Sequence, residues 1–239
     1  MKKVRVLVVT SNKDRHRYLC HILKKQHDLV GIVSEKKGDY YLEHQQKSDL
    51  VMSHFKTLSL KEKQIFGSLE FPSTPIYRLR KSEINLPDVI EWAKKKKPEV
   101  IVLFGTGLLD SNWLETFSGK IINIHLGYSP NYRGSATLFW PFFFNDLKHL
   151  GVTLHVAVEN VDAGQILTIV KPDNLDGDYY SITTNLIKKA LDNIGNIVYR
   201  YIDKSIQLKT QNTSLGKVYK KADFSEKSLK KVLLMFGER

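Results

Sequence analysis

Four short apolar runs rich in β-branched residues constrain the fold of this chain more than any other feature. They lie at residues 4–10, 29–34, 100–104 and 121–125, and the last of them ends in alternating polar residues. Runs without polar alternation are typical of parallel strands that are covered on both faces. Helical patterns separate these runs, so the sequence predicts the α/β class, with a Rossmann-like, mostly parallel sheet and helices on both of its faces.

The segment between the first two runs predicts a complete strand–helix–strand unit. A helix is expected from Asp14 to about Gln26, because its apolar residues fall on one helical face. The preceding turn, Ser-Asn-Lys-Asp at 11–14, lacks the G-x-G-x-x-G pattern, which argues against a nicotinamide or flavin site. Further helices are expected at 84–97, 110–117 and 182–202, and further strands at 151–158 and 165–171.

Two segments depart from this alternating pattern. Residues 35–75 are polar and lack clean periodicity apart from a short helix expected at 59–66; they form either a variable surface insertion or a loop that shapes a substrate pocket. Residues 205–239 form a tail with a short helix capped by Ser225, whose apolar stripe is suited to docking or to a homodimer. We therefore expect a catalytic domain at 1–204 and a C-terminal appendage at 205–239.

The composition limits the compartment and leaves the meaning of the charge open. No stretch approaches the roughly 18 apolar residues of a membrane span, and the first apolar run is too short for a signal peptide. The single cysteine, Cys20, excludes an internal disulfide framework and fits a reducing cytoplasm. A net charge of +12 is compatible with a lysine-rich surface without function, with nucleic acid, or with a phosphate-bearing substrate.

The most informative chemistry lies between residues 121 and 167. Asn123 and His125 share one face of a strand end because side chains alternate along a strand, and Asp162 follows one strand later. An amide, an imidazole and a carboxylate at neighbouring strand ends suit an acyl-transfer site. Each residue alone is more often a turn former or a cap, but the three together favour a site. His155 is expected to be a packed or supporting histidine.

This segment resembles the catalytic core of the folate-dependent formyltransferases, which take their formyl group from 10-formyltetrahydrofolate. The likeness rests on Asn123-x-His125, on the Pro-x-Tyr-Arg-Gly loop at 130–134 and on Asp162-x-Gly164. Glu159 also matches the loop that commonly reads Asp-Glu-Gly-Ile-Asp-Thr-Gly in the family. Departures from that loop are found at Val158, Asn160 and Ala163.

The resemblance implies the formyltransferase fold and a set of site residues. Asn123 would donate its amide hydrogens to the oxyanion, His125 would act as the acid–base, and Asp162 would orient and tune His125. The residues implied in binding the folate are Phe104, Gly105, Thr106, Leu108 and Glu159. Tyr132, Arg133 and Gly134 are expected to bind the substrate, and Arg133 is suited either to a phosphate or carboxylate or to a surface ion pair. No metal is expected, since the sequence has no His/Cys cluster at metal-ligand spacing.

The acceptor is predicted with less detail. The resemblance is strongest to the nucleotide-sugar N-formyltransferases, which implies an amino sugar on a nucleoside diphosphate, used for surface polysaccharide. Glycinamide ribonucleotide or another small amine is the alternative, and the short tail argues against methionyl-tRNA. A hydrolase of formylfolate and a non-catalytic folate-binding or nucleic-acid-binding protein are the other hypotheses. Nucleic acid is disfavoured because aromatic residues are not interleaved with the basic runs.

Overall fold

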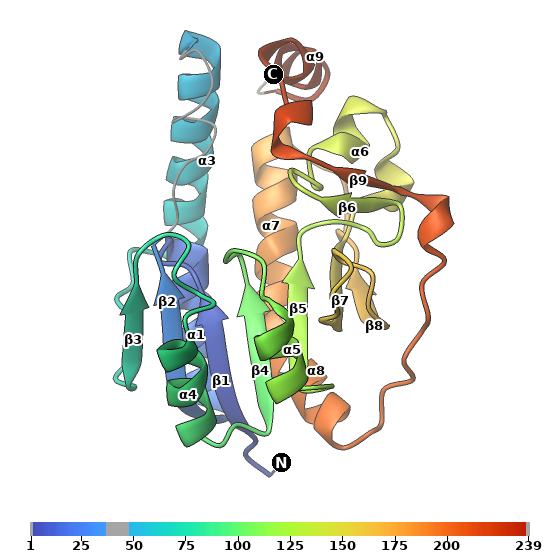
Figure 1. Ribbon diagram of the computed structural model, residues 1–239. Coiled ribbons are helices and arrows are strands. Elements are labelled where there is room, and N and C mark those ends of the chain that lie inside the picture. The colour runs from blue at the N-terminus through green and yellow to red at the C-terminus, as the bar shows by residue number, and fades with distance from the viewer. Residues whose placement is uncertain (1, 37–47, 238–239) are drawn as a thin grey trace.

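A seven-stranded sheet forms the centre of the computed structural model, which describes residues 2–36 and 48–237 (Figure 1). The first five strands in spatial order are parallel, and the last two are antiparallel to their neighbours. The predicted Rossmann-like, mostly parallel sheet is therefore confirmed. In spatial order the strands are β3 (Ile76–Leu79), β2 (Asp28–Glu35), β1 (Arg5–Thr10), β4 (Val100–Phe104), β5 (Ile121–His125), β7 (Val152–Val156) and β8 (Ile166–Val170). Of these, β3 is a strand that the sequence did not predict.

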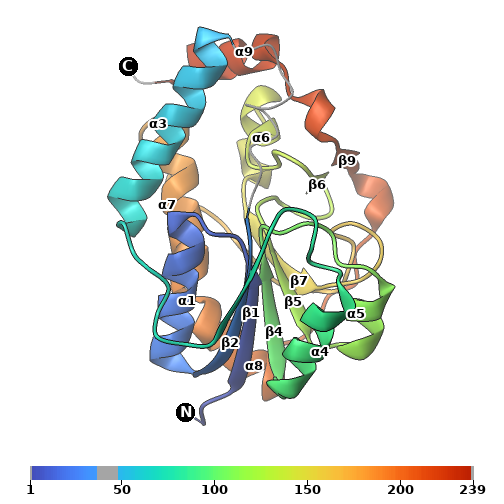
Figure 2. The same cartoon turned by 60° about the vertical axis from the view of Figure 1, so that its left-hand side comes forward.

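Both faces of the sheet are buried, as the apolar runs require. On β1, Val6 and Val8 belong to one hydrophobic cluster, whereas Leu7 and Val9 belong to a second cluster on the opposite face. Figure 2 shows the two helical layers on either side of the sheet. The first layer holds α1 (Asp14–Gln26), α7 (Tyr179–Asp192) and α8 (Ile194–Ile202), and the second holds α4 (Pro87–Lys95) and α5 (Ser111–Thr116).

The helix predicted at 59–66 is much longer in the structure. Helix α3 spans Asp49–Phe66 and begins at Ser48, whose side chain accepts a hydrogen bond from the Val51 N–H. His54 lies inside this helix and is buried against the aromatic rings of α7. The buried face of the helix includes the polar residues His54 and Glu62, which hid this periodicity. Within the described part of the chain, no helix is both long and apolar enough to cross a membrane.

The helix predicted at 182–202 is divided in the structure. Helix α7 begins earlier than predicted, where the Asp178 side chain accepts a hydrogen bond from the Ser181 N–H. Asn193 separates α7 from α8, and its side chain donates to the Lys189 carbonyl. The apolar stripe continues across this break, which explains why the sequence pattern indicated one helix.

The insertion or loop that the sequence predicts at 35–75 is described only in part, because residues 37–47 lie outside the described residues.

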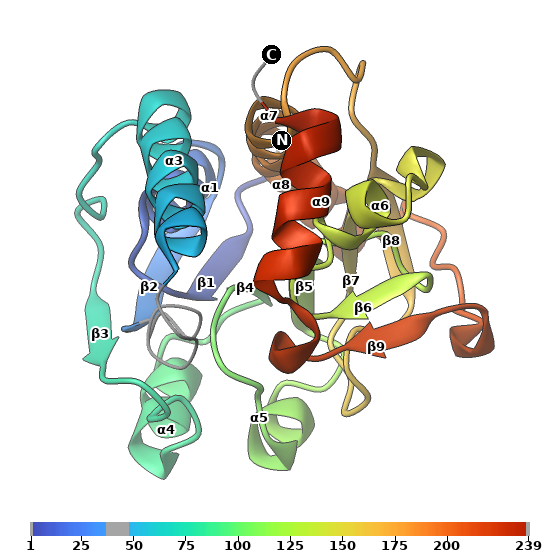
Figure 3. The same ribbon diagram turned by 90° about the horizontal axis from the view of Figure 1, so that it is seen from above.

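The segment after residue 204 packs onto the rest of the molecule. Strand β9 (Lys217–Tyr219) pairs in parallel with β6 (Tyr132–Gly134), which was predicted to be part of a loop; Figure 3 shows the two strands side by side. Helix α9 (Glu226–Phe236) is capped by Ser225 and lies against α3, α6 (Trp140–Phe143) and α7. Short 3-10 turns complete the described elements at Leu147–His149, Thr213–Leu215 and Lys221–Asp223.

Two leucines of α9 test whether this helix is part of the hydrophobic core. Leu229 is fully buried (0% exposed) in the cluster that also contains α1 and α7, whereas Leu234 on the same helix is 78% exposed. We expect Leu229→Ala to lower the free energy of unfolding by about 2–5 kcal/mol in chemical denaturation, because a buried cavity is created. The matched variant Leu234→Ala should change it by less than about 0.5 kcal/mol. Equal effects of the two changes would contradict this packing.

Candidate active site

The end of β5 places Asn123 and His125 on one face of the sheet, as the sequence predicted. Asn123 lies between Leu103 of β4 and His155 of β7, with which it is in register on either side. His125 is in register with Thr153, and its ring is buried. The Thr153 hydroxyl donates to the Gly127 carbonyl (2.7 Å) and accepts from the Ser129 N–H (3.0 Å), so β7 also fixes the loop that follows β5.

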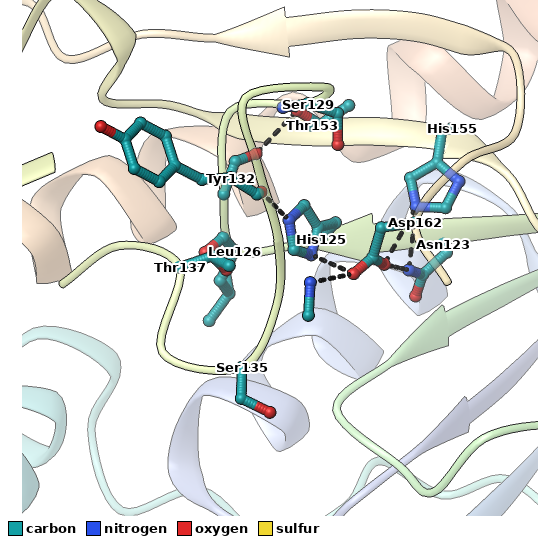
Figure 4. Close-up of polar contacts among 12 residues, drawn as sticks. Asn123, His125, Leu126, Ser129, Tyr132, Ser135, Thr137, Thr153, His155 and Asp162 are labelled. Carbon is teal, nitrogen blue, oxygen red and sulfur yellow. Dashed lines mark hydrogen bonds and ion pairs between the residues drawn. The ribbon is translucent and has the colours of Figure 1, made fainter. Parts of the chain in front are cut away.

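The carboxylate of Asp162 lies at the centre of a connected polar network (Figure 4). Its Oδ2 atom is 3.1 Å from Nδ1 of His125 and accepts a hydrogen bond from the Gly134 N–H (2.9 Å). Its Oδ1 atom accepts a hydrogen bond from Nδ2 of Asn123 (3.2 Å). The structure therefore brings together Asn123, His125 and Asp162, which are the three residues predicted to be catalytic. Their catalytic roles stay a prediction at this stage.

Asp162 holds this central position with an unusual backbone conformation. Its φ angle is +51°, in the left-handed region that residues other than glycine rarely adopt. Two residues on, an ideal Cβ atom added to Gly164 would lie 1.8 Å from the Val156 carbonyl oxygen. Only glycine allows the chain to turn back so closely against β7. The Asp-x-Gly pattern thus has a steric reason in this loop.

Both ring nitrogens of His125 face oxygen atoms of the protein. Nε2 donates to the Tyr132 carbonyl (2.8 Å), and Nδ1 faces the Asp162 carboxylate. Gly127 lies against the ring, and an ideal Cβ atom there would be 2.4 Å from Nε2. The ring satisfies both contacts as an imidazolium, because each acceptor then receives an N–H. Proton uptake by His125 is thus directly coupled to Asp162.

The charges of this site act on one another through its low-dielectric surroundings. Burial lowers the pKa of His125, while the Asp162 carboxylate and the Tyr132 carbonyl act in the opposite direction; His155 and Arg133 add to the lowering. Burial favours a raised pKa for Asp162, but the His125 charge and hydrogen bonds from His155 and Gly134 outweigh it and hold that pKa below its usual value. These contacts favour the anionic form of Asp162, most strongly when His125 is protonated.

The Asn123 amide is occupied by neighbours within the protein. Its Nδ2 atom donates to Asp162 and lies 3.1 Å from Nε2 of His155. Nδ1 of His155 donates to the Val156 carbonyl (2.9 Å). Its Nε2 atom accepts from Asn123 when the ring is neutral, and it can donate to Oδ1 of Asp162 (3.4 Å) when the ring is protonated. His155 is thus a direct member of the network. The sequence analysis expected a packed or supporting histidine at this position, and the antiparallel pairing of β7 with β5 places it opposite Asn123.

The three residues predicted to bind the substrate contribute to the network mainly through their backbone. The Tyr132 ring is buried, stacks on Tyr219 and donates its hydroxyl to Asp146 (2.9 Å). The Arg133 side chain is also buried and donates to the Thr213 carbonyl (3.0 Å). The Tyr132 carbonyl and the Gly134 N–H hold His125 and Asp162, respectively. Their contact with a substrate stays a prediction.

The residues predicted to bind the folate fall into two groups. The Phe104 ring is buried against the His16 ring, so a contact from this residue would use its backbone. Beyond it, Gly105 has a φ angle of +71° and starts a turn that exposes the Leu108 side chain (73% exposed). Glu159 is also exposed, and Thr106 is partly exposed, with its hydroxyl donating to the Gly107 carbonyl (2.9 Å).

Two polar side chains hold the turn after β4, and no sequence pattern singled them out. Glu35, at the end of β2, is buried and accepts hydrogen bonds from the N–H groups of Gly107 (2.8 Å) and Ser82 (2.9 Å). Asn85 donates to the Leu108 carbonyl (3.0 Å) and accepts from the Asp110 N–H (3.1 Å). The turn is therefore held by side chains from other segments of the chain.

Among the described residues, no group of three or more His, Cys, Asp or Glu side chains is placed to hold a metal ion.

The coupling between Asp162 and His125 makes a prediction about proton binding. We expect Asp162→Asn to lower the pKa of His125 further, because the negative charge that stabilises the imidazolium is lost. NMR titration of the imidazole nitrogens measures this change. The control Glu159→Gln removes an exposed carboxylate from the same loop and should leave the His125 titration unchanged. An unchanged His125 titration in Asp162→Asn would contradict the coupling.

Comparison with known sequences finds related formyltransferases. The model of the family described as formyl transferase matches residues 2–192. The methionyl-tRNA formyltransferase of Finegoldia magna is 28% identical over 158 residues, which are 61% of this chain and 49% of that protein. The methionyl-tRNA formyltransferase of Clostridioides difficile is 27% identical over 179 residues, 73% of this chain and 50% of that protein. This chain spans about half the length of these curated relatives.

Solved structures share the fold at lower sequence identity. An N-formyltransferase from Helicobacter canadensis, in complex with folinic acid and dTDP-3-aminofucose, has a TM-score of 0.59 and 17% identity, covering 98% of this chain and 80% of that one. The phosphoribosylglycinamide formyltransferase of Anaplasma phagocytophilum has a TM-score of 0.63 and 16% identity, and the match covers 92% of this chain and 100% of that one. The match of the family model over most of the sequence confirms the resemblance, and this chain belongs to the formyl transferase family.

Proposed function

We propose that this protein transfers a formyl group from 10-formyltetrahydrofolate to an amine at the site formed by Asn123, His125 and Asp162. The observation that carries the proposal is the single hydrogen-bonded network of these side chains at the end of β5, in a chain of the formyl transferase family. An amide, an imidazole and a carboxylate in contact provide an oxyanion donor and a proton relay. Neither a passive binding protein nor a nucleic-acid binder needs this arrangement.

The residues of the network suit the proton movements of such a transfer. The folate supplies the formyl carbon, which passes to the amine, and one proton leaves the amine nitrogen while the folate nitrogen gains one. The pair of His125 and the Asp162 anion can take up the proton that leaves the amine, because an imidazolium at His125 gains a hydrogen bond to Asp162. Asn123 can stabilise the oxyanion once its amide exchanges Asp162 or His155 for it.

The turn after β4 suits the folate in the way the family resemblance implies. The pterin would lie against backbone groups of residues 104–108, where Gly105 permits a close approach and Leu108 offers an apolar surface. β4 neighbours β5, with Leu103 in register with Asn123, so this turn starts two residues beyond the level of the predicted oxyanion donor. The Glu35 carboxylate keeps the turn in one conformation.

Glu35 offers a test of the folate site. We expect Glu35→Gln to weaken binding of 5-formyltetrahydrofolate, an analogue that does not transfer its formyl group, by roughly tenfold or more in calorimetry. An amide cannot accept from both the Gly107 and the Ser82 N–H as the carboxylate does. The matched variant Glu91→Gln, on the exposed face of α4, should bind like the wild type. Unchanged affinity in Glu35→Gln would count against folate at this turn.

For the acceptor, we propose the amine of an amino sugar linked to a nucleoside diphosphate. Support comes from the likeness of the Tyr132-Arg133-Gly134 loop to the nucleotide-sugar N-formyltransferases. The basic net charge also suits a diphosphate. The complex of the Helicobacter canadensis enzyme contains such a compound, dTDP-3-aminofucose. Methionyl-tRNA is the competing acceptor, because the curated relatives are methionyl-tRNA formyltransferases. Glycinamide ribonucleotide is a third candidate.

Mass spectrometry of the products separates these acceptors. The protein is incubated with 10-formyltetrahydrofolate and, separately, with dTDP-linked 3- and 4-amino sugars, methionyl-tRNA and glycinamide ribonucleotide. We expect a formylated amino sugar, and a loss of product on the order of 10²-fold or more in His125→Asn. A formylated tRNA or ribonucleotide alone would replace the acceptor and keep the reaction. Formate released without an amine would indicate a hydrolase, and no reaction at all would refute formyl transfer.

A further inference from the structure

The C-terminal segment, residues 205–237, reaches the site through the side chain of Gln211. Nε2 of Gln211 donates to the backbone carbonyl of Asp162 (3.0 Å) and to that of Gly164 (2.6 Å). Because both partners are carbonyl oxygens, only the nitrogen end of the amide can make these contacts. The two bonds span the turn that carries the carboxylate of the network. No sequence pattern indicated this role for a residue in the tail.

This turn needs an external support more than an ordinary loop does. Asp162 has a φ of +51°, a conformation that persists in a residue other than glycine when its surroundings hold it. On one side the turn presses against β7, where Gly164 meets the Val156 carbonyl. On the other side Gln211 supplies two hydrogen bonds to its backbone. Gln211 is thus placed to keep Asp162 in the position from which it contacts His125.

The same segment also supports the histidine side of the pair. Strand β9 pairs with β6, and the Ser135 N–H donates to the Tyr219 carbonyl (2.8 Å) while the Lys217 N–H donates to the Asn131 carbonyl (3.2 Å). β6 in turn supplies the Tyr132 carbonyl that accepts from His125. Both members of the His125–Asp162 pair are therefore attached to the C-terminal segment, one through β9 and the other through Gln211.

We propose that Gln211 is a positioning residue that sets the distance between Asp162 and His125, and that the C-terminal segment is thereby an integral part of the site. For its effect on rate this inference rests on the proposed formyl transfer, but its effect on proton binding can be measured without any reaction. Without Gln211 the turn can relax and carry the carboxylate away from the ring. The attraction between the Asp162 carboxylate and the His125 imidazolium then weakens, because the distance between the two charges increases.

The direction of the effect on His125 follows from the charged groups around it. Asp162 is the negative group that faces the ring, whereas the Arg133 guanidinium, and His155 when it is protonated, add positive charge. A carboxylate held close favours the imidazolium, and a carboxylate that moves away favours the neutral ring. Loss of Gln211 should therefore move the titration of His125 to lower pH. A residue that only stabilised the fold would leave this titration unchanged.

The experiment compares Gln211→Met with Gln207→Met. Methionine keeps the length of the side chain and removes the amide, and Gln207 is an exposed residue of the same segment. Imidazole NMR, with His125 assigned from the His125→Asn spectrum, follows the titration in each protein, and transfer assays give kcat and KM. In Gln211→Met we expect the His125 titration at lower pH and a fall in kcat of roughly tenfold to a hundredfold. Gln207→Met should match the wild type in both.

The His125 titration decides the proposal. An unchanged His125 titration in a folded Gln211→Met protein overturns it, even if the melting temperature falls. If that variant does not fold, Gln211→Asn replaces it, since it keeps the amide but withdraws it by one methylene group, and the same shift to lower pH is expected. If the wild type transfers no formyl group, the proposed function fails, and the NMR titration alone still decides whether Gln211 positions Asp162.

Discussion

The candidate site depends on the contacts of the Asp162 carboxylate. It accepts hydrogen bonds from Asn123 and Gly134 and lies beside His125, so a single charge orders groups from three separate segments. A buried anion is stable only when such donors surround it. The strained backbone of Asp162 shows that this position is imposed by its surroundings. Removing any one support is therefore expected to affect the others.

The fold supplies these supports from distant parts of the sequence. β5 provides Asn123 and His125 near its C-terminal end, between β4 and β7 in a sheet whose two faces are buried. The loop between β7 and β8 provides Asp162, and β6 provides the backbone groups that hold both members of the pair. Glu35 and Gln211 act at one step removed, on the turn after β4 and on the turn at Asp162. Local rigidity at the site thus comes from contacts between segments.

The sequence predicted the parts of this structure that depend on local patterns. The buried strands and the placement of Asn123 and His125 on one face follow from the period of two along a strand, and the structure agrees. Helix α3 was underestimated because its buried face includes His54 among polar neighbours. The pairing of β6 with β9 was missed because strands this short carry no periodic signal and the two are far apart in the chain. Gln211 lies in a polar stretch, where nothing distinguishes it from a solvated residue.

A crystal structure of the protein with 5-formyltetrahydrofolate tests the account most directly. The account predicts the pterin against residues 104–108 and the formyl oxygen within hydrogen-bond distance of the Asn123 amide. Asn123 would then have given up its contact with Asp162 or His155, and Asp162 would still lie beside His125. A folate bound elsewhere, or a formyl group out of reach of Asn123 with the network unchanged, would contradict the claim that this carboxylate-centred network is a formyl-transfer site.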